Sequence, residues 1–184
     1  MRYMLFTKKR LLITVAIIIA IILALFLIMA DGTAVTASAS TKKLPIYCTQ
    51  QTEKIASLSF DAAWGAEDTA LLIDILGRYK VKATFFVVGN WVDTYPDQVK
   101  ALAAAGHEIQ NHSDNHPHMP QLSAEKMATE IKTCNDKIEA ITNKRPILFR
   151  PPYGDYSNTL LDVLQNQGMY CIQWDVETNG ICLL

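Results

Sequence analysis

The chain has 184 residues, which is enough for one globular domain with an appendage. Hydrophobic residues make up 50% of it and charged residues 19%, and these values exclude a disordered or collagen-like chain. The charge is uneven, because residues 1–43 carry six basic and one acidic side chains, whereas residues 44–184 carry 11 and 17. The acidic C-terminal part argues against nucleic acid as a partner, since binding phosphates requires basic surfaces.

One apolar segment stands out near the N-terminus. Leu11–Ala30 is 20 residues long and would span about 30 Å as a helix, the thickness of the hydrocarbon core of a membrane. Three basic residues at positions 8–10 precede it, which predicts a cytoplasmic basic segment over residues 1–10 and a transmembrane signal anchor over residues 11–30. The alternative is a secretory signal that is cleaved near Ala39. Both interpretations place the rest of the chain on the extracytoplasmic side, either held in the cell membrane by a single pass or secreted.

Small polar residues predict a flexible linker over residues 31–50, followed by one domain over residues 51–184. In this domain short apolar runs alternate with amphipathic stretches, which favours strands of a parallel sheet connected by helices. The sheet could be an open α/β sheet or part of a (β/α) barrel. The expected strands are residues 55–60, 83–88, 107–110, 146–149 and 169–174, and the expected helices are residues 67–79, 97–105, 123–142 and 157–167.

Polar side chains follow several of the expected strands. Asp61 comes directly after the first strand, His112 and His116 follow the third, and Arg150 and Tyr153 follow the fourth. The carboxyl ends of parallel strands meet at one edge of a sheet or one mouth of a barrel. We therefore expect these five side chains to lie together.

This set of side chains is suited to metal-assisted hydrolysis. The imidazoles of His112 and His116 are nitrogen ligands of the kind that Zn²⁺ prefers, and Asp61 could coordinate the ion or act as a general base. Arg150 could pair with this carboxylate, and the backbone N–H of Tyr153 could donate to an oxyanion. The alternatives are two surface histidines, an aspartate that caps a turn and a solvated arginine.

Five short motifs together resemble the polysaccharide deacetylase family, which is also called the NodB homology domain or carbohydrate esterase family 4. The first has the FDAAWG form that is found in polysaccharide deacetylases of spore-forming bacteria. The resemblance implies a deformed (β/α) barrel that removes N-acetyl groups from cell-wall or chitin-like polysaccharide, above all peptidoglycan, with a divalent metal such as Zn²⁺. The motifs are SFD with WG in residues 59–65, ATFF at 83–86, GHE at 106–108, HSxxH at 112–116 and RPPYG at 150–154.

The resemblance also implies a role for each candidate residue. Asp61 corresponds to the general base, and His112 and His116 correspond to two metal ligands. Arg150 corresponds to the residue that orients the base, and Tyr153 to the oxyanion donor. With Asp61 as the third possible ligand, the cofactor would be a weakly bound divalent metal.

The sequence departs from the family at three positions. The metal-binding aspartate that follows the base is Ala62 here, the carboxylate that pairs with the arginine would fall at Gly180, and no histidine follows His118 to act as the general acid. We therefore expect a barrel that is incomplete at the C-terminus, with a disruption near residue 178 and an exposed sheet edge. Two interpretations remain open: a membrane-anchored deacetylase, or an inactive relative that at most binds glycan.

Overall fold

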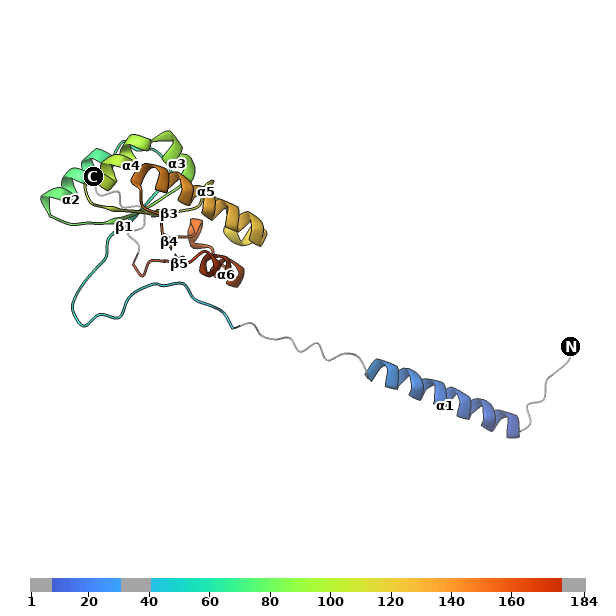
Figure 1. The fold of residues 1–184 in the computed structure, drawn as a ribbon. Helices are drawn as coiled ribbons and strands as arrows, with labels where there is room; N and C mark the ends of the chain where they lie inside the picture. Colours follow the sequence, from blue (N-terminus) through green and yellow to red (C-terminus); the bar gives the residue numbers. More distant parts are fainter. Residues whose placement is uncertain (1–7, 31–40, 177–184) are drawn as a thin grey trace. The chain divides into compact units, whose positions relative to one another are not determined.

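The computed structural model describes residues 8–30 and 41–176, and the chain divides into two units, residues 1–41 and 42–184. In the first unit, helix α1 covers Lys8–Ala30 (Figure 1). Its segment Lys8–Phe26 has a mean hydropathy of 2.5 and is long enough to cross a membrane, and a signal sequence at this place would meet the same criteria. The expected cleavage site near Ala39 and the departure at Gly180 lie outside the described residues.

The second unit contains a five-stranded parallel sheet whose strands lie side by side in chain order. An open doubly wound sheet reverses its strand order at a switch point, whereas a (β/α) barrel adds each strand next to the last. The sequential order therefore identifies the barrel type of winding among the two expected alternatives. The strands are β1 (Ser59–Ala62), β2 (Thr84–Val87), β3 (Glu108–Asn111), β4 (Leu148–Phe149) and β5 (Tyr170–Cys171).

Strand β1 lies further along the chain than the apolar run at residues 55–60 predicts. It begins at Ser59, which is opposite Thr84, the first residue of β2. Residues 55–58 are not part of a strand, although the Leu58 carbonyl accepts a hydrogen bond from the backbone N–H of Thr84 at 3.1 Å. Asp61 consequently lies inside β1, opposite Phe86, and not in the loop after it.

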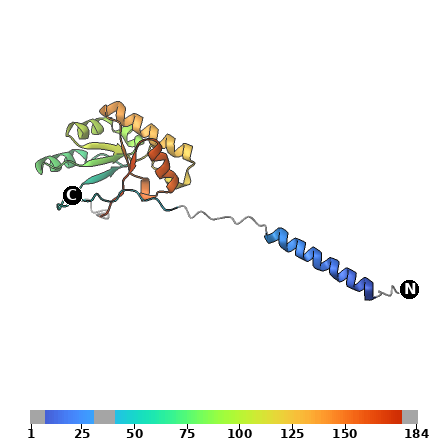
Figure 2. The same cartoon turned by 60° about the horizontal axis from the view of Figure 1, so that its bottom comes forward.

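The helices cover the sheet much as expected, with one addition. Helix α3 was not predicted, because its six residues are too few to show a helical period. In Figures 1 and 2, α2, α3, α4 and α5 lie together along β1–β3, and α6 lies beside β4 and β5. The helices are α2 (Thr69–Arg78), α3 (Gly89–Thr94), α4 (Pro96–Ala104), α5 (Ala124–Thr142) and α6 (Asn158–Asn166), with 3-10 turns η1 (Met119–Gln121) and η2 (Pro152–Gly154).

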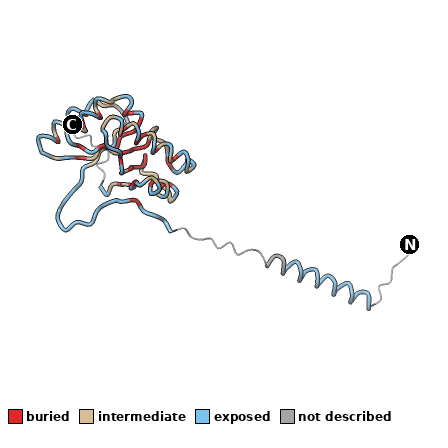
Figure 3. Tube along the Cα trace, in the orientation of Figure 1, coloured by how far each residue is buried: buried red, intermediate tan, exposed pale blue. Residues whose placement is uncertain are grey.

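Helix α5 contributes to both of the apolar clusters that hold the sheet and the helices together. Its residues Cys134 and Ile138 belong to the cluster around Phe85, and Met127 and Ile131 belong to the cluster around Phe149. The 4-3-4-3 spacing of apolar residues predicts a stripe of these four side chains and Ile141; the four are buried, and Ile141 is half-buried against the first cluster. Ser123 caps the helix by accepting a hydrogen bond from the Lys126 N–H, as Ser and Thr often do. Figure 3 shows the buried segments gathered on the strands and the inner sides of the helices.

The outer edge of β5 is partly covered by a segment that we expected to belong to the linker. Ile46 forms a parallel bridge with Ile172, in which its N–H donates to the Cys171 carbonyl and its carbonyl accepts from the Gln173 N–H, both at 2.8 Å. Nearby, Lys43 forms an ion pair with Asp162 of α6. The sheet edge that the sequence predicts to be exposed therefore has a short backbone partner at its C-terminal end.

This bridge can be tested with Ile46→Pro. Proline has no N–H, so the bond to Cys171 is lost and the unfolding free energy should fall by about 1–3 kcal/mol. Ile46→Ala is the control, because it keeps the N–H and removes a side chain that is 40% exposed. Urea unfolding of the full chain, followed by tryptophan fluorescence, measures both variants. Equal losses in the two variants would contradict a backbone role for Ile46.

A second prediction concerns His107, whose Nδ1 accepts a hydrogen bond from the Ala83 N–H at 3.2 Å. Burial, and secondarily the charge of Lys82, lowers the pKa of His107. The unfolded chain then binds this proton more tightly, so the stability from neutral His107 is complete above about pH 6.5 and is lost as the pH falls below it. The unfolding free energy of His107→Gln should decline less between pH 6.5 and 5 than that of the unchanged chain. Parallel pH profiles would refute this expectation.

Candidate functional site

Asp61 and Arg150 form the centre of the candidate site. Arg150 follows β4, and its Nη1 donates to Asp61 Oδ1 at 2.7 Å, while its Nη2 donates to Ser59 Oγ at 2.7 Å. Ser59 and Asp61 are two residues apart on β1, so their side chains leave the strand on the same face. One guanidinium thus binds two side chains of β1 and fixes the orientation of the carboxylate.

The guanidinium of Arg150 is almost completely enclosed, with only 5% of the side chain exposed. It lies over the ring of Phe86 at 4.1 Å and 5.7 Å from the ring of Trp174. Stacking on aromatic rings and paired donation are properties of arginine that lysine cannot reproduce. The solvated arginine considered as an alternative is therefore wrong, and Arg150 pairs with Asp61 as predicted.

His112 lies beside this pair. Its Nδ1 is 2.7 Å from the Arg150 carbonyl oxygen, which can only accept a hydrogen bond, so Nδ1 carries the proton. In the neutral ring this leaves a lone pair on Nε2, which lies 3.9 Å from Asp61 Oδ2. Burial lowers the pKa of His112, and the Asp61 charge offsets part of this effect. Imidazoles that bind metals are commonly held in this way, with the second nitrogen on a carbonyl group.

His116 lies next to His112, with the ring centroids 5.0 Å apart. Its Nδ1 is buried and has no hydrogen-bond partner, and burial is the main cause that lowers its pKa. The Tyr153 ring lies 4.7 Å from it and also stacks on His118, which is hydrogen bonded to Asp155 at 2.5 Å. The structure thus brings Asp61, His112, His116, Arg150 and Tyr153 to one end of the sheet, and their chemical roles remain predictions.

The donor groups fit a divalent metal in kind, since two imidazole nitrogens and a carboxylate are a common ligand set for Zn²⁺. The unpartnered Nδ1 of His116 is in keeping with such a use. Within residues 8–30 and 41–176, however, no three His, Cys, Asp or Glu side chains are arranged to hold a metal ion. Asp61 is bound to Arg150, and Ala62 packs against the apolar core. Among the described residues, the imidazoles of His112 and His116 are therefore the main candidate donors for a metal, and Asp61 Oδ2, which lies 3.9 Å from His112 Nε2, is a possible third.

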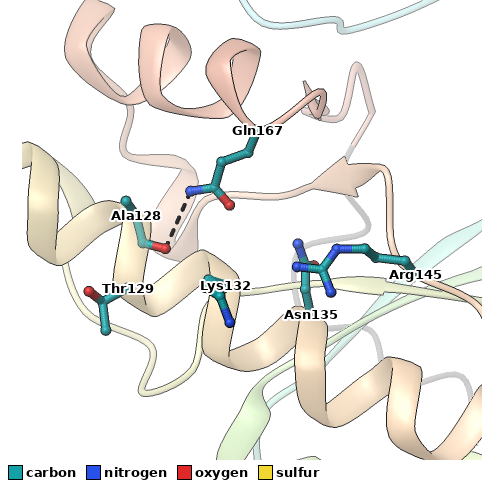
Figure 4. Close-up of a pocket in the computed structure, with 6 residues that line it drawn as sticks. All are labelled: Ala128, Thr129, Lys132, Asn135, Arg145 and Gln167. Atoms are coloured by element: carbon teal, nitrogen blue, oxygen red, sulfur yellow. Dashed lines mark hydrogen bonds between the residues drawn. The ribbon is translucent and has the colours of Figure 1, made fainter.

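Two further features were not predicted from the sequence. Ser59 could have been found from the two-residue period of a strand, which places it on the same face as Asp61. A cavity of about 380 Å³ between α5 and α6 is lined by residues that include Lys132, Arg145 and Gln167 (Figure 4). Lys132 and Arg145 pair with carboxylates of α5, so this cavity presents no uncompensated charge and is separate from the site.

Comparison with known proteins gives consistent matches. The family model described as polysaccharide deacetylase matches residues 49–172. The peptidoglycan-N-acetylmuramic acid deacetylase PdaA of Bacillus subtilis (strain 168) is 33% identical over 125 residues, which are 67% of this chain and 48% of that protein. The chain therefore spans about half the length of this relative.

Solved structures also match this chain. A family 4 carbohydrate esterase (CE4) pseudoenzyme from Bacillus anthracis matches with a TM-score of 0.70 and 34% identity, over 72% of this chain and 47% of that one. A mutant of the same protein, with restored enzymatic activity, matches with a TM-score of 0.70 and 35% identity, over 72% of this chain and 49% of that one. These structures confirm the expected α/β fold.

The pairing of Asp61 with Arg150 predicts a large effect of Asp61→Ala on stability. The substitution leaves a buried guanidinium without an opposite charge, so we expect the unfolding free energy to fall by about 2–4 kcal/mol. Asp74→Ala is the matched control, because Asp74 pairs with Arg78 on an exposed surface of α2 and should change stability by less than about 0.5 kcal/mol. Denaturant titration measures the unfolding free energy of both variants. Equal losses would contradict a larger contribution of the buried pair to stability.

Proposed function

Because the chain belongs to the polysaccharide deacetylase family, we propose that it hydrolyses N-acetyl groups of peptidoglycan or a related N-acetylated glycan. The observation that carries this proposal is the Asp61 carboxylate, which Arg150 holds 3.9 Å from His112 Nε2 at the C-terminal end of the sheet. The named activity of PdaA, a peptidoglycan-N-acetylmuramic acid deacetylase, supports the substrate class.

Each of these side chains has a separate role in the proposed reaction. Asp61 removes a proton from a water molecule, whose oxygen attacks the carbonyl carbon of the acetyl group. The C–N bond then breaks, acetate is released, and the proton that Asp61 took is available to the departing sugar nitrogen. Arg150 orients the carboxylate, and the backbone N–H of Tyr153 is the proposed donor to the oxyanion.

His112 and His116, with Asp61 as a third group, are the residues that would hold a divalent metal, with Zn²⁺ as the expected ion. When bound, such an ion polarises the acetyl carbonyl and supplies chemistry that the side chains alone lack. Since Ala62 offers no donor, we expect the metal to bind weakly and to be lost easily during purification.

A second candidate is glycan binding without turnover. Ala62 favours it, because the family has a metal-binding aspartate at this position, and so does the similarity to a CE4 pseudoenzyme. Exposed aromatic side chains next to the histidines, Trp64 and Tyr153, offer faces on which a sugar ring could stack.

The proposed location is the extracytoplasmic side of the cell membrane, where the glycan is found. The length and composition of α1 support an anchor, and cleavage near Ala39 would give a secreted form in the same compartment.

Release of acetate from N-acetylglucosamine oligomers and from peptidoglycan fragments tests the proposal. With added Zn²⁺ or Co²⁺ we expect turnover that a chelator abolishes and that His112→Ala lowers by about 10²–10⁴-fold. Asp74→Ala serves as the control with full activity. Glycan binding without acetate release, under every metal condition, would replace the first candidate with the second.

A further inference from the structure

The loop that carries the two histidines has an unusual backbone. Ser113 and His116 both have positive φ values, 67° and 58°, in the left-handed region that side chains other than glycine rarely adopt. Such conformations persist where the surrounding structure determines them, so the groups that contact this loop decide where the imidazoles point.

Part of this support comes from the end of β3. The buried Asn111 accepts a hydrogen bond from the Ser113 N–H at 2.7 Å and donates to Asn135 of α5 at 2.7 Å. Ser113 Oγ in turn accepts from the His116 N–H at 3.0 Å. These bonds link the two ends of the loop. They do not involve the backbone N–H groups of its middle residues, Asp114 and Asn115.

Helix α3 holds the loop from one side. The N–H groups of Gly89 and Asn90 donate to the carbonyls of Ser113 and Asp114, both at 3.0 Å. The approach is so close that a Cβ at Gly89 would lie 2.0 Å from Asp114 Oδ1 and 3.1 Å from the Asp114 Cα. The loop therefore cannot move toward α3.

Helix α5 holds it from the other side through Glu130. One oxygen of this carboxylate accepts from the backbone N–H groups of Asp114 at 3.0 Å and Asn115 at 2.9 Å, and the other accepts from the Asn115 side chain at 2.8 Å. Lys137, which is seven residues further along α5, forms ion pairs with Asp114 at 2.6 Å and Asp93 at 2.7 Å. Its charge offsets part of the negative charge of Asp93, Asp114 and Glu130.

We infer that Glu130 is a positioning residue, which acts through the backbone of Asp114 and Asn115 to fix the directions of the His112 and His116 imidazoles. This role deepens the proposed function, and its consequence for metal affinity rests on that function. Neither the sequence motifs nor the spacing of the histidines marks Glu130, because it lies 14 residues beyond His116 on a helix.

The test compares Glu130→Ala, Glu130→Gln and Glu139→Ala in the full chain. Glutamine keeps one oxygen that can accept both backbone N–H groups, whereas alanine loses all three hydrogen bonds. Glu139 lies on the same helix and pairs with Arg145 away from the loop, so it controls for the loss of a carboxylate from α5. The readouts are Co²⁺ affinity with its visible spectrum, the NMR signals of the His112 and His116 rings, and amide exchange at Asp114 and Asn115.

We expect Glu130→Ala to weaken Co²⁺ binding about 10–100-fold, as loss of groups that orient metal ligands commonly does. The variant should also shift the NMR signals of both rings and speed the hydrogen exchange of both backbone amides. In Glu130→Gln all three readouts should stay close to those of the unchanged chain. In Glu139→Ala they should equal those of the unchanged chain. If Glu130→Ala fails to fold, Glu130→Asp, which withdraws the carboxylate by one methylene group, replaces it.

The outcomes separate the two proposals. If the unchanged chain binds no Co²⁺, the metal part of the proposed function fails, and the ring signals alone then decide the role of Glu130. A folded Glu130→Ala variant with unchanged ring signals overturns the inference, as does a Co²⁺ affinity no weaker than that of Glu139→Ala in a chain that binds the ion.

Discussion

The contact between Asp61 and Arg150 joins two strands that are not neighbours. Strands β2 and β3 lie between β1 and β4, so in a flat sheet their ends would be about 14 Å apart, farther than the two side chains reach. A separation of 2.7 Å therefore requires a curved sheet, with the pair on its inner side. The curvature also brings the Arg150 carbonyl to His112, so one arginine orients both the Asp61 carboxylate and the His112 imidazole.

The parts of the fold that local sequence patterns determine were predicted well. The apolar stripe of α5 and its Ser123 cap can be predicted directly, because helical period and capping depend on nearby residues. The start of β1 was misplaced, because it depends on where β2 begins, about 25 residues later in the chain. The choice between an open sheet and a barrel likewise depends on strand order, which no local pattern contains.

The same distinction applies to the site. The strand-end rule and the family motifs predicted that Asp61, His112, His116, Arg150 and Tyr153 lie together, since all five are within a strand or a few residues after one. Ser59 was recoverable from strand alternation, whereas Glu130 was not, because a carboxylate on an amphipathic helix looks like any solvated residue. A side chain that binds this loop from a neighbouring helix is recognised only when the helix packing is known.

The bridge between Ile46 and Ile172 has a consequence for how the protein is made. Its two partners are 126 residues apart in the chain, and Ile46 leaves the ribosome first. Contacts between distant residues slow folding, because a long loop must close before they form. The outer edge of β5 therefore stays open to intermolecular pairing until the Ile46 segment binds it, and this step requires both Ile46 and Ile172 to have been synthesised.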